Sequence, residues 1–348
     1  METKNRHLKT NKTNNDLIFE PSQEIIDFRT NGQMLSYEVN NDYQQNKDIY
    51  KLREKIALRN KKRIELEEKY GYMTDEAVKK RWIKALIAVI AYFFLSFIFV
   101  YVIQIALIFG YALLHNGDAG LTEDSPLYAS AMEFYNSMTN IIIYVIELAV
   151  ILPILFGFVK YDFSRIFRTT KSTLVGIFTS IFSFPIVMAP YLLGFFITFL
   201  LGGSETSANQ EAIDSMLFGK YGVILMLFVA VIGPIVEELV FRKGLHTLLF
   251  PRKKNFGWKM LRAFIVACIF GSIHVVSAVL LSLLSLDFSG MLGHLVQVFP
   301  YIGMGFGFSF LYEINDENII PSTIAHVGWN SFSISTMLLQ VLLEKLTR

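Results

Sequence analysis

The sequence predicts an all-α, polytopic membrane protein: a bundle of about seven transmembrane helices preceded by a charged cytoplasmic N-terminal extension. Of the 348 residues, 53% are hydrophobic and the mean hydropathy is +0.43. This is too apolar for an ordinary water-soluble chain. The charges gather in the N-terminal segment and in short connectors. The remaining apolar runs reach about 20 residues or more, which is long enough to cross a bilayer core about 30 Å thick.

The N-terminal extension is polar. Residues 1–47 are rich in Asn, Lys, Gln and Thr, which predicts disorder. Residues 48–81 are predicted to form a charged helix, and their basic cluster RNKKR at 59–63 favours contact with anionic lipid headgroups over nucleic acid. The start of the chain shows no secretory signal, so we expect the N-terminus in the cytoplasm. The single cysteine, Cys268, excludes a disulfide within the chain.

Seven apolar runs are predicted to span the membrane, at 84–114, 138–159, 174–201, 221–249, 262–284, 291–312 and 319–343. Pro185 and Pro190 predict a kink or a break in the third run. In the sixth run, Gly303 and Gly307 have GxxxG spacing, which allows helices to approach closely. We therefore expect an N-terminal segment at 1–81, the first two transmembrane helices within 82–169, and a core at 170–345.

The charges of the connectors predict the orientation, since basic connectors face the cytoplasm. The connector after the first span is acidic and is placed outside, whereas the strongly basic connector at 251–262 is placed inside. With seven spans the C-terminus lies outside. If the third run were two spans, the 251–262 connector would face the wrong side, so seven is preferred. One connector breaks the rule: EINDEN, at 313–318, is acidic but falls on the cytoplasmic side.

Ionisable residues within the spans are the candidates for function, because charges in a membrane are costly and are usually kept for a role. They are Glu147, Glu237, Glu238, Arg242, His274, His294 and His326. The i,i+4 spacing of Glu238 and Arg242 predicts an ion pair that makes the helix tolerable in lipid. Glu237 lies about 100° around the helix from Glu238 and has no predicted partner. It is therefore the candidate general base.

Two further spans supply histidines. His274 follows Phe270 by one helical turn, so the two share a face. His326 and Asn330 also share a face, and their imidazole and amide groups are both able to donate to a developing oxyanion. The predicted orientation brings these residues and Glu237 to similar depths, between the middle of the membrane and its cytoplasmic face.

The other ionisable residues are predicted to lie outside this site. Glu147 is expected to bond to a neighbouring helix or to line a cavity. His294 falls near the outer end of its helix, and His246 is expected near the membrane interface with its ring reaching towards water.

Three motifs resemble those of the CPBP (CAAX protease and bacteriocin-processing, or Abi) family of intramembrane proteases. The family pattern is EExxxR, FxxxH and HxxxN, and the chain has EELVFR at 237–242, FGSIH at 270–274 and HVGWN at 326–330. The resemblance covers roughly residues 170–345.

The resemblance implies a role for each motif residue. Glu237 would activate a water molecule with the help of His274, and His326 with Asn330 would stabilise the tetrahedral intermediate. Residues expected to support the site are Glu238, Arg242 and Phe270.

Whether a metal takes part is left open by the residues. Members of the family are often described as metalloproteases, and the candidate ligands for zinc or another divalent metal are Glu237, His274 and His326. The chain has no HExxH zinc motif. A glutamate and histidine that activate water without metal are the alternative, and we favour it.

The predicted function is an intramembrane endopeptidase in the cell membrane, with its active site towards the cytoplasm. Its expected partners are the lipid bilayer and a membrane-associated peptide or protein substrate, prenylated or carrying a leader peptide; no nucleic acid is expected. The alternative is a non-proteolytic regulator or bacteriocin-immunity protein that binds another membrane protein. A proton or ion transporter would require polar residues across the full membrane depth and an internal repeat, and neither is evident in the sequence.

Overall fold

The computed structural model describes residues 49–54, 56–58, 61, 65, 75–166, 170–203, 207–249 and 255–347. Contacts divide the chain into two units, Met1–Met73 and Thr74–Arg348. The described residues of the first unit are helical and exposed, in agreement with the predicted charged helix. The predicted disorder at 1–47 lies outside the described residues.

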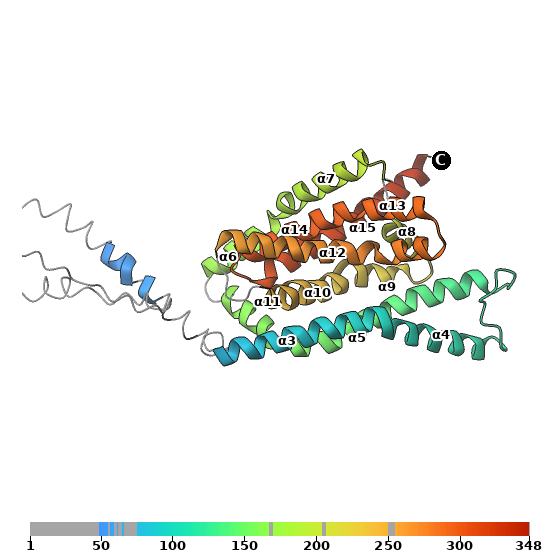
Figure 1. Cartoon of the computed structure of the whole chain (residues 1–348), viewed down its shortest axis with the longest axis horizontal. Helices are drawn as coiled ribbons and strands as arrows, with labels where there is room; N and C mark the ends of the chain where they lie inside the picture. The colour runs from blue at the N-terminus through green and yellow to red at the C-terminus, as the bar shows by residue number, and fades with distance from the viewer. Residues whose placement is uncertain are drawn as a thin grey trace, which may run out of the picture. The chain divides into compact units, whose positions relative to one another are not determined.

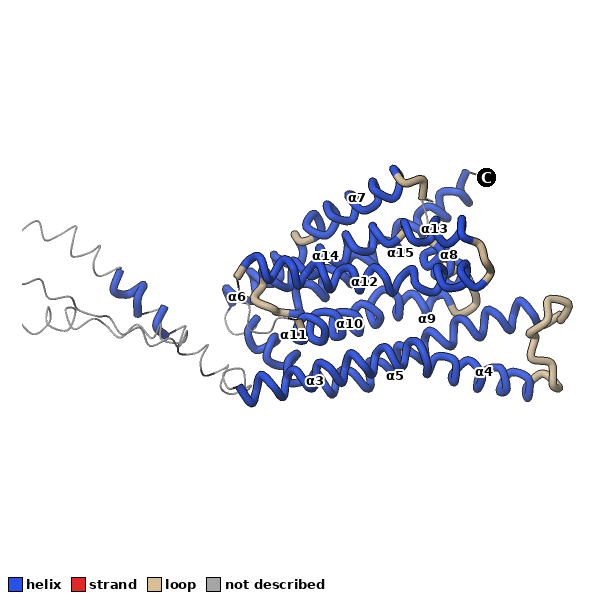
Figure 2. The backbone as a smooth tube through the Cα atoms, viewed as in Figure 1, coloured by secondary structure: helices blue, strands red, loops and turns tan. Residues whose placement is uncertain are grey.

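The second unit is a bundle of helices, and its described residues contain no strand (Figure 2). Its elements are α3 (Asp75–Phe94), η1 (Leu95–Phe99), α4 (Val100–Leu114), α5 (Tyr128–Ile166), α6 (Thr170–Ile181), α7 (Phe184–Leu200), α8 (Ala208–Leu217), α9 (Gly222–Leu227), η2 (Phe228–Ile232), α10 (Gly233–Glu238), η3 (Leu239–Leu245), α11 (His246–Leu248), α12 (Phe256–Leu284), α13 (Phe288–Val296), α14 (Val298–Ile314) and α15 (Ile319–Thr347). The three η segments are π-helical turns within longer helices.

Six helical runs among the described residues are long and apolar enough to cross a membrane: 76–114, 128–166, 176–200, 222–248, 256–284 and 288–314. The predicted all-α polytopic bundle is confirmed, with a count of six against the seven expected. The seventh predicted run forms α15, which is helical as expected but is not among the six. Its first half carries the polar residues Ser322, Thr323, His326 and Asn330.

The predicted break in the third run is confirmed. Helix α6 ends at Ile181 and α7 begins at Phe184, so Pro185 lies in the first turn of the new helix, where its missing N–H removes no helical bond. Pro190 remains inside α7.

The close approach predicted for the GxxxG pair is also confirmed. A Cβ at Gly303 would overlap the carbonyl oxygen of Pro190, and one at Gly307 would overlap the backbone of Val187. Both partners belong to α7, so glycine allows α14 and α7 to pack with their backbones in contact.

The arrangement places the motif-bearing helices in the middle of the second unit. In Figure 1, α3, α4 and α5 run along one edge and α7 along the other, with α10, α12, α14 and α15 between them. Helix α10 packs against α5 and α15, and α14 packs against α7, α12 and α15. The three motifs therefore lie on helices shielded by neighbours on both sides.

Candidate active site

The fourth span has an irregular backbone around its two glutamates. Helix α10, which carries Glu237 and Glu238, lies between the π-helical segments η2 and η3. Such π-turns occur frequently at functional sites. Within η2, the N–H of Gly233 donates to the carbonyl of Phe228, five residues back. In the same register the carbonyl of Val229 would need the N–H of residue 234, but that residue is Pro234 and has none.

Asn330 supplies the missing donor. Its Nδ2 donates to the carbonyl oxygen of Val229 at 2.9 Å, which joins α15 to the fourth span just before the glutamates. The asparagine of the third motif therefore has a structural partner in the π-turn. Its second amide hydrogen and its side-chain oxygen have no such bond among the described contacts.

His326 lies between the two glutamates. Its Nδ1 is 3.0 Å from Glu238 Oε1, and its Nε2 is 3.6 Å from Glu237 Oε2. Because a carboxylate can only accept, the Nδ1 of His326 donates to Glu238 and the orientation of the ring is fixed. Glu238 and His326 are buried, whereas 17% of the Glu237 side chain is exposed. Glu237 is thus the carboxylate of the pair that a water molecule can reach.

Arg242 neutralises Glu238, as its spacing predicts. The Nε of Arg242 is 3.3 Å from Glu238 Oε2, and both side chains are fully buried. The guanidinium also donates to the carbonyl of Gly305 at 3.4 Å and lies 5.6 Å from the centre of the Phe270 ring. A buried cation that is paired, hydrogen-bonded and packed against aromatic rings is stabilised in a site that excludes water.

His274 approaches the same site from α12. Its Nδ1 donates to the carbonyl of Phe270 at 2.8 Å, which leaves Nε2 as the acceptor of the neutral ring. The ring stacks on Tyr301 with centroids 4.5 Å apart and is close enough to Glu237 and His326 to interact with their charges. Phe270 is fully buried against the rings of both His274 and His326, at centroid distances of 4.5 and 6.0 Å.

His294 was not expected in the site, yet it lines the same small cavity as His274. Ser207 and Gln297 also border this cavity. The hydroxyl of Ser207 is 2.7 Å from that of Tyr301, the residue on which His274 stacks. The sequence offers no motif for Tyr301 or His294, because their contacts come from helix packing rather than from spacing along the chain.

Two other ionisable residues of the spans have partners that bear on the predictions. Glu147 is buried and accepts a hydrogen bond from the Ser96 hydroxyl at 2.6 Å, as expected for a bond to a neighbouring helix. The prediction for His246 is wrong. Its ring is buried rather than directed to the interface, because Glu313 lies 3.3 Å away and Tyr312 packs against it.

The predicted metal ligands are not arranged around a common point. Among the residues that the structure describes, no three His, Cys, Asp or Glu side chains are grouped so as to hold a metal ion. Both ring nitrogens of His326 already face carboxylates, Nδ1 that of Glu238 and Nε2 that of Glu237. We therefore derive no catalytic step through a metal. The choice of Glu237, His274 and His326 as metal ligands stays a prediction.

Comparison with known proteins supports the resemblance found in the motifs. Residues 219–332, which contain all three motifs, match the family model described as type II CAAX prenyl endopeptidase Rce1-like. This region is therefore similar to the CPBP family. The matched CPBP-like region is narrower than the 170–345 expected from the motifs, and the helices α3 to α8 lie outside it.

Curated relatives of similar sequence include two named as a membrane protease or peptidase. The chain is 32% identical over 143 residues to the membrane-embedded CAAX protease MroQ of Staphylococcus aureus, which is 41% of this chain and 50% of the relative. It is 30% identical over 137 residues to the putative membrane peptidase YdiL of Bacillus subtilis, which is 39% of this chain and 46% of the relative. The chain spans about half the length of the curated relatives it matches. No solved structure matches it.

Proposed function

We propose that the chain is an intramembrane endopeptidase that hydrolyses peptide bonds of membrane-associated substrates. The observation that carries the proposal is the group formed by Glu237, Glu238 and His326, in which one carboxylate orients the imidazole and the other is reachable by water. Further support comes from the CPBP-like region and from relatives named as a CAAX protease and a putative membrane peptidase.

In the proposed mechanism, Glu237 accepts a proton from a water molecule while the water oxygen forms a bond to the scissile carbonyl carbon. His274 assists by holding the water through its acceptor Nε2. The tetrahedral intermediate then collapses, the C–N bond breaks, and Glu237 gives its proton to the leaving amine.

The oxyanion of the intermediate is stabilised by Asn330 and His326. Asn330 offers the amide hydrogen that Val229 does not use. His326 is a donor at Nε2 when both ring nitrogens carry protons, and Glu237 and Glu238 are the counter-charges for that form.

We further propose that the protein acts in the cell membrane, with its N-terminus in the cytoplasm and the site towards the cytoplasmic side. The basic connector at 251–262 supports this orientation. The expected substrate is a peptide held at the membrane by a prenyl group or a leader segment. The name CAAX protease of the Staphylococcus aureus relative supports a lipid-modified substrate.

The test is cleavage of a peptide library by purified protein in lipid vesicles, with wild type, Glu237→Gln and Glu123→Gln compared side by side. Glu123 is an exposed glutamate in the connector between α4 and α5, so the same substitution there is a matched control. We expect wild type and Glu123→Gln to cleave equally and Glu237→Gln to be slower by about 10²- to 10⁴-fold. A parallel series with a chelator measures any contribution of a divalent metal.

Equal cleavage by wild type and Glu237→Gln would overturn the role of Glu237. If no variant cleaves any peptide, while Glu237→Gln still binds a membrane-protein partner as wild type does, the bundle is a binding module and the regulator alternative is correct.

A further inference from the structure

The acidic EINDEN connector at 313–318, the exception to the rule for connector charges, forms a tight turn between α14 and α15. Asp316 and Glu317 have positive φ angles of 55° and 58°, so the chain reverses sharply there. Glu313 lies in the last turn of α14 with a buried side chain, and the connector leads directly into the helix that carries His326.

Basic side chains from three other elements surround this turn. Arg262 of α12 binds Glu313 Oε1 at 2.6 Å and Glu317 Oε1 at 2.8 Å. Lys243 of η3 donates to the backbone carbonyl of Glu317 at 2.6 Å. Arg165 of α5 donates to the carbonyl of Asp316 at 2.8 Å. Arg262 therefore compensates the charges of Glu313 and Glu317, while Lys243 and Arg165 hold the backbone of the turn.

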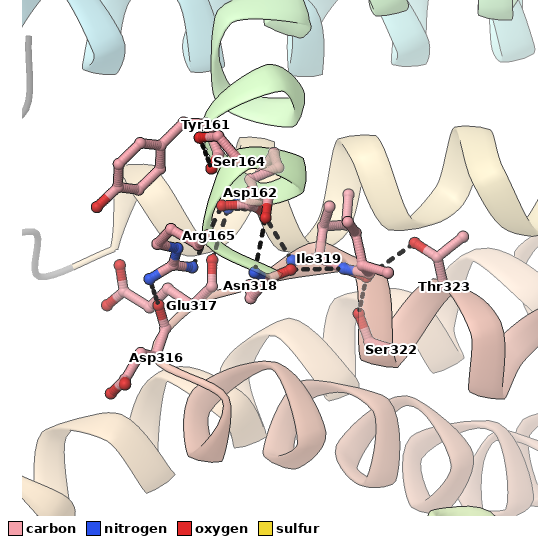
Figure 3. A network of polar contacts seen from close by, with 12 residues as sticks. Tyr161, Asp162, Ser164, Arg165, Asp316, Glu317, Asn318, Ile319, Ser322 and Thr323 are labelled. Atoms are coloured by element: carbon pink, nitrogen blue, oxygen red, sulfur yellow. Dashed lines mark hydrogen bonds and ion pairs between the residues drawn. The ribbon is translucent and has the colours of Figure 1, made fainter. Parts of the chain in front are cut away.

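Asp162 of α5 contacts the end of this turn and the start of α15, and Figure 3 shows it beside Arg165, Asn318 and Ile319. It is fully buried, and its Oδ2 accepts the backbone N–H of Ile319 at 2.9 Å and faces Lys243 Nζ at 2.5 Å. Its backbone carbonyl accepts from Asn318 Nδ2 at 3.2 Å. Ile319 is the first residue of α15, so Asp162 caps that helix from a different helix of the bundle.

The Asp162 carboxylate has three contacts: Oδ1 lies 3.3 Å from Arg165 of the same helix, and Oδ2 contacts Ile319 and Lys243. The contacts with Ile319 and Lys243 lead to the two sides of the candidate active site. His326 lies about 10 Å along α15 from the capped end, at 1.5 Å per residue. Lys243 directly follows Arg242, which pairs with Glu238. One carboxylate thus holds the helix of His326 and the helix of Glu238 at a common point.

We propose that Asp162 is a positioning residue that sets α15 against η3, and through them His326 against Glu238. The proposal rests on the proposed function only for its effect on cleavage. A shift of about 1 Å in a catalytic group can cost about 10²-fold in rate, even when the change is far from the reacting atoms. Asp162 lies outside the CPBP-like region, so the helices before residue 219 take part in forming the site.

The first readout is the side-chain ¹⁵N spectrum of His326 in lipid nanodiscs, assigned by its loss in His326→Gln. We expect Asp162→Ala to move these signals, because the bond between Nδ1 and Glu238 is altered. The matched control is Asp118→Asn, since Asp118 also accepts a backbone N–H, from Gly120, but in the connector between α4 and α5. The control should leave the signals of His326 in place.

A double variant separates the effect of an unpaired charge from a general loss of folding. Asp162→Asn alone leaves both Lys243 and Arg165 without the charge of Asp162. Its combination with Lys243→Met removes the closer and more deeply buried of these two cations and keeps an oxygen for the Ile319 N–H. We expect the double variant to return the His326 signals towards wild type. Thermal unfolding of each variant identifies any that fails to fold.

The second readout is steady-state cleavage, in which Asp162→Ala should lower kcat by about 10²-fold with a much smaller change in KM. Unchanged His326 signals in folded Asp162→Ala would overturn the proposal, whatever the cleavage result. If Asp162→Ala shifts the His326 signals but wild type cleaves no peptide, the positioning role of Asp162 is upheld and the endopeptidase function is contradicted.

Discussion

Two polar clusters share the π-helical segment η3, which supplies Arg242 to one and Lys243 to the other, and they differ in how their charges are compensated. In the connector cluster, formed by Asp162, Lys243, Arg262, Glu313 and Glu317, every carboxylate has a lysine or arginine within 4.0 Å. In the site cluster, formed by Glu237, Glu238, Arg242 and His326, Arg242 forms its ion pair with Glu238. Of the described residues, only His326 comes within ion-pair distance of Glu237.

The comparison indicates which buried charges stabilise the fold and which are kept for chemistry. Compensated charges can be held in an apolar bundle because each has its partner, and removal of one partner exposes the other to the full cost of desolvation. A carboxylate without a cation is costly in a membrane and is retained for function. The ion pairs of Arg262 should therefore control stability, Asp162 should in addition position the site, and Glu237 should control the reaction.

The largest loss of stability is expected when the connector cluster is broken. Arg262→Met leaves the buried carboxylate of Glu313 without its closest cation, so the free energy of unfolding should fall by about 3–5 kcal/mol. Reversible unfolding in mixed micelles measures this free energy of unfolding. The double variant Arg262→Met with Glu313→Gln should recover much of the loss, and a double variant no more stable than the single one would contradict the ion-pair explanation.

Asn330→Ala tests whether a residue of the candidate active site affects the reaction more than it affects stability. The loss of one oxyanion donor should lower kcat by about 10²- to 10³-fold. The broken bond to Val229 should cost about 1 kcal/mol of stability, well below the effect of Arg262→Met. Cleavage and unfolding are measured on the same preparation. A wild-type kcat in Asn330→Ala would show that Asn330 stabilises the π-turn at Val229 and takes no part in the reaction.

Gly303→Ala changes packing without changing any charge. The added methyl group would overlap the Pro190 carbonyl oxygen and separate α14 from α7, at a cost of about 1–3 kcal/mol. Gly293→Ala in α13 is the control, because a Cβ there has no neighbour within 4 Å. Thermal unfolding should separate the two variants clearly, and equal midpoints would mean that the close contact of the helices does not contribute.

The smallest effect is expected at Asp118, an exposed carboxylate outside the spans. Hydrogen bonds from the Gly120 N–H and the Ser125 hydroxyl hold the pKa of Asp118 below its usual value. A lowered folded-state pKa stabilises the loop above the unfolded pKa, and the effect is lost as the pH falls through the folded pKa. Amide exchange of Gly120 should be slower in wild type than in Asp118→Asn at pH 7, and the difference should vanish in strong acid. Equal exchange rates at pH 7 would contradict this.

Much of the architecture could be predicted from the sequence because hydropathy and helical spacing are local properties. The membrane helices, the break before Pro185 and the Glu238–Arg242 pair depend on runs or intervals along the chain, and each is present. The motifs also picked out Glu237 and His326, whose side chains meet although 89 positions separate them.

Contacts between distant helices could not be predicted. Nothing in the spacing indicates that His326 binds Glu238, that Asn330 fills the place of the N–H missing from Pro234, or that Asp162 caps α15. The acidic EINDEN connector was the one visible signal. Its conflict with the orientation rule was noted without an explanation, and the structure shows that Arg262 pairs with its Glu313 and Glu317.

The division between the two clusters is tested most directly by cleavage rate and unfolding free energy measured together for Glu237→Gln and Arg262→Met. We expect Glu237→Gln to lose cleavage while unfolding like wild type. Arg262→Met should unfold more easily while its folded fraction cleaves at the wild-type rate. If Glu237→Gln cleaves normally, or if both variants lose activity and stability in parallel, the clusters do not have separate roles.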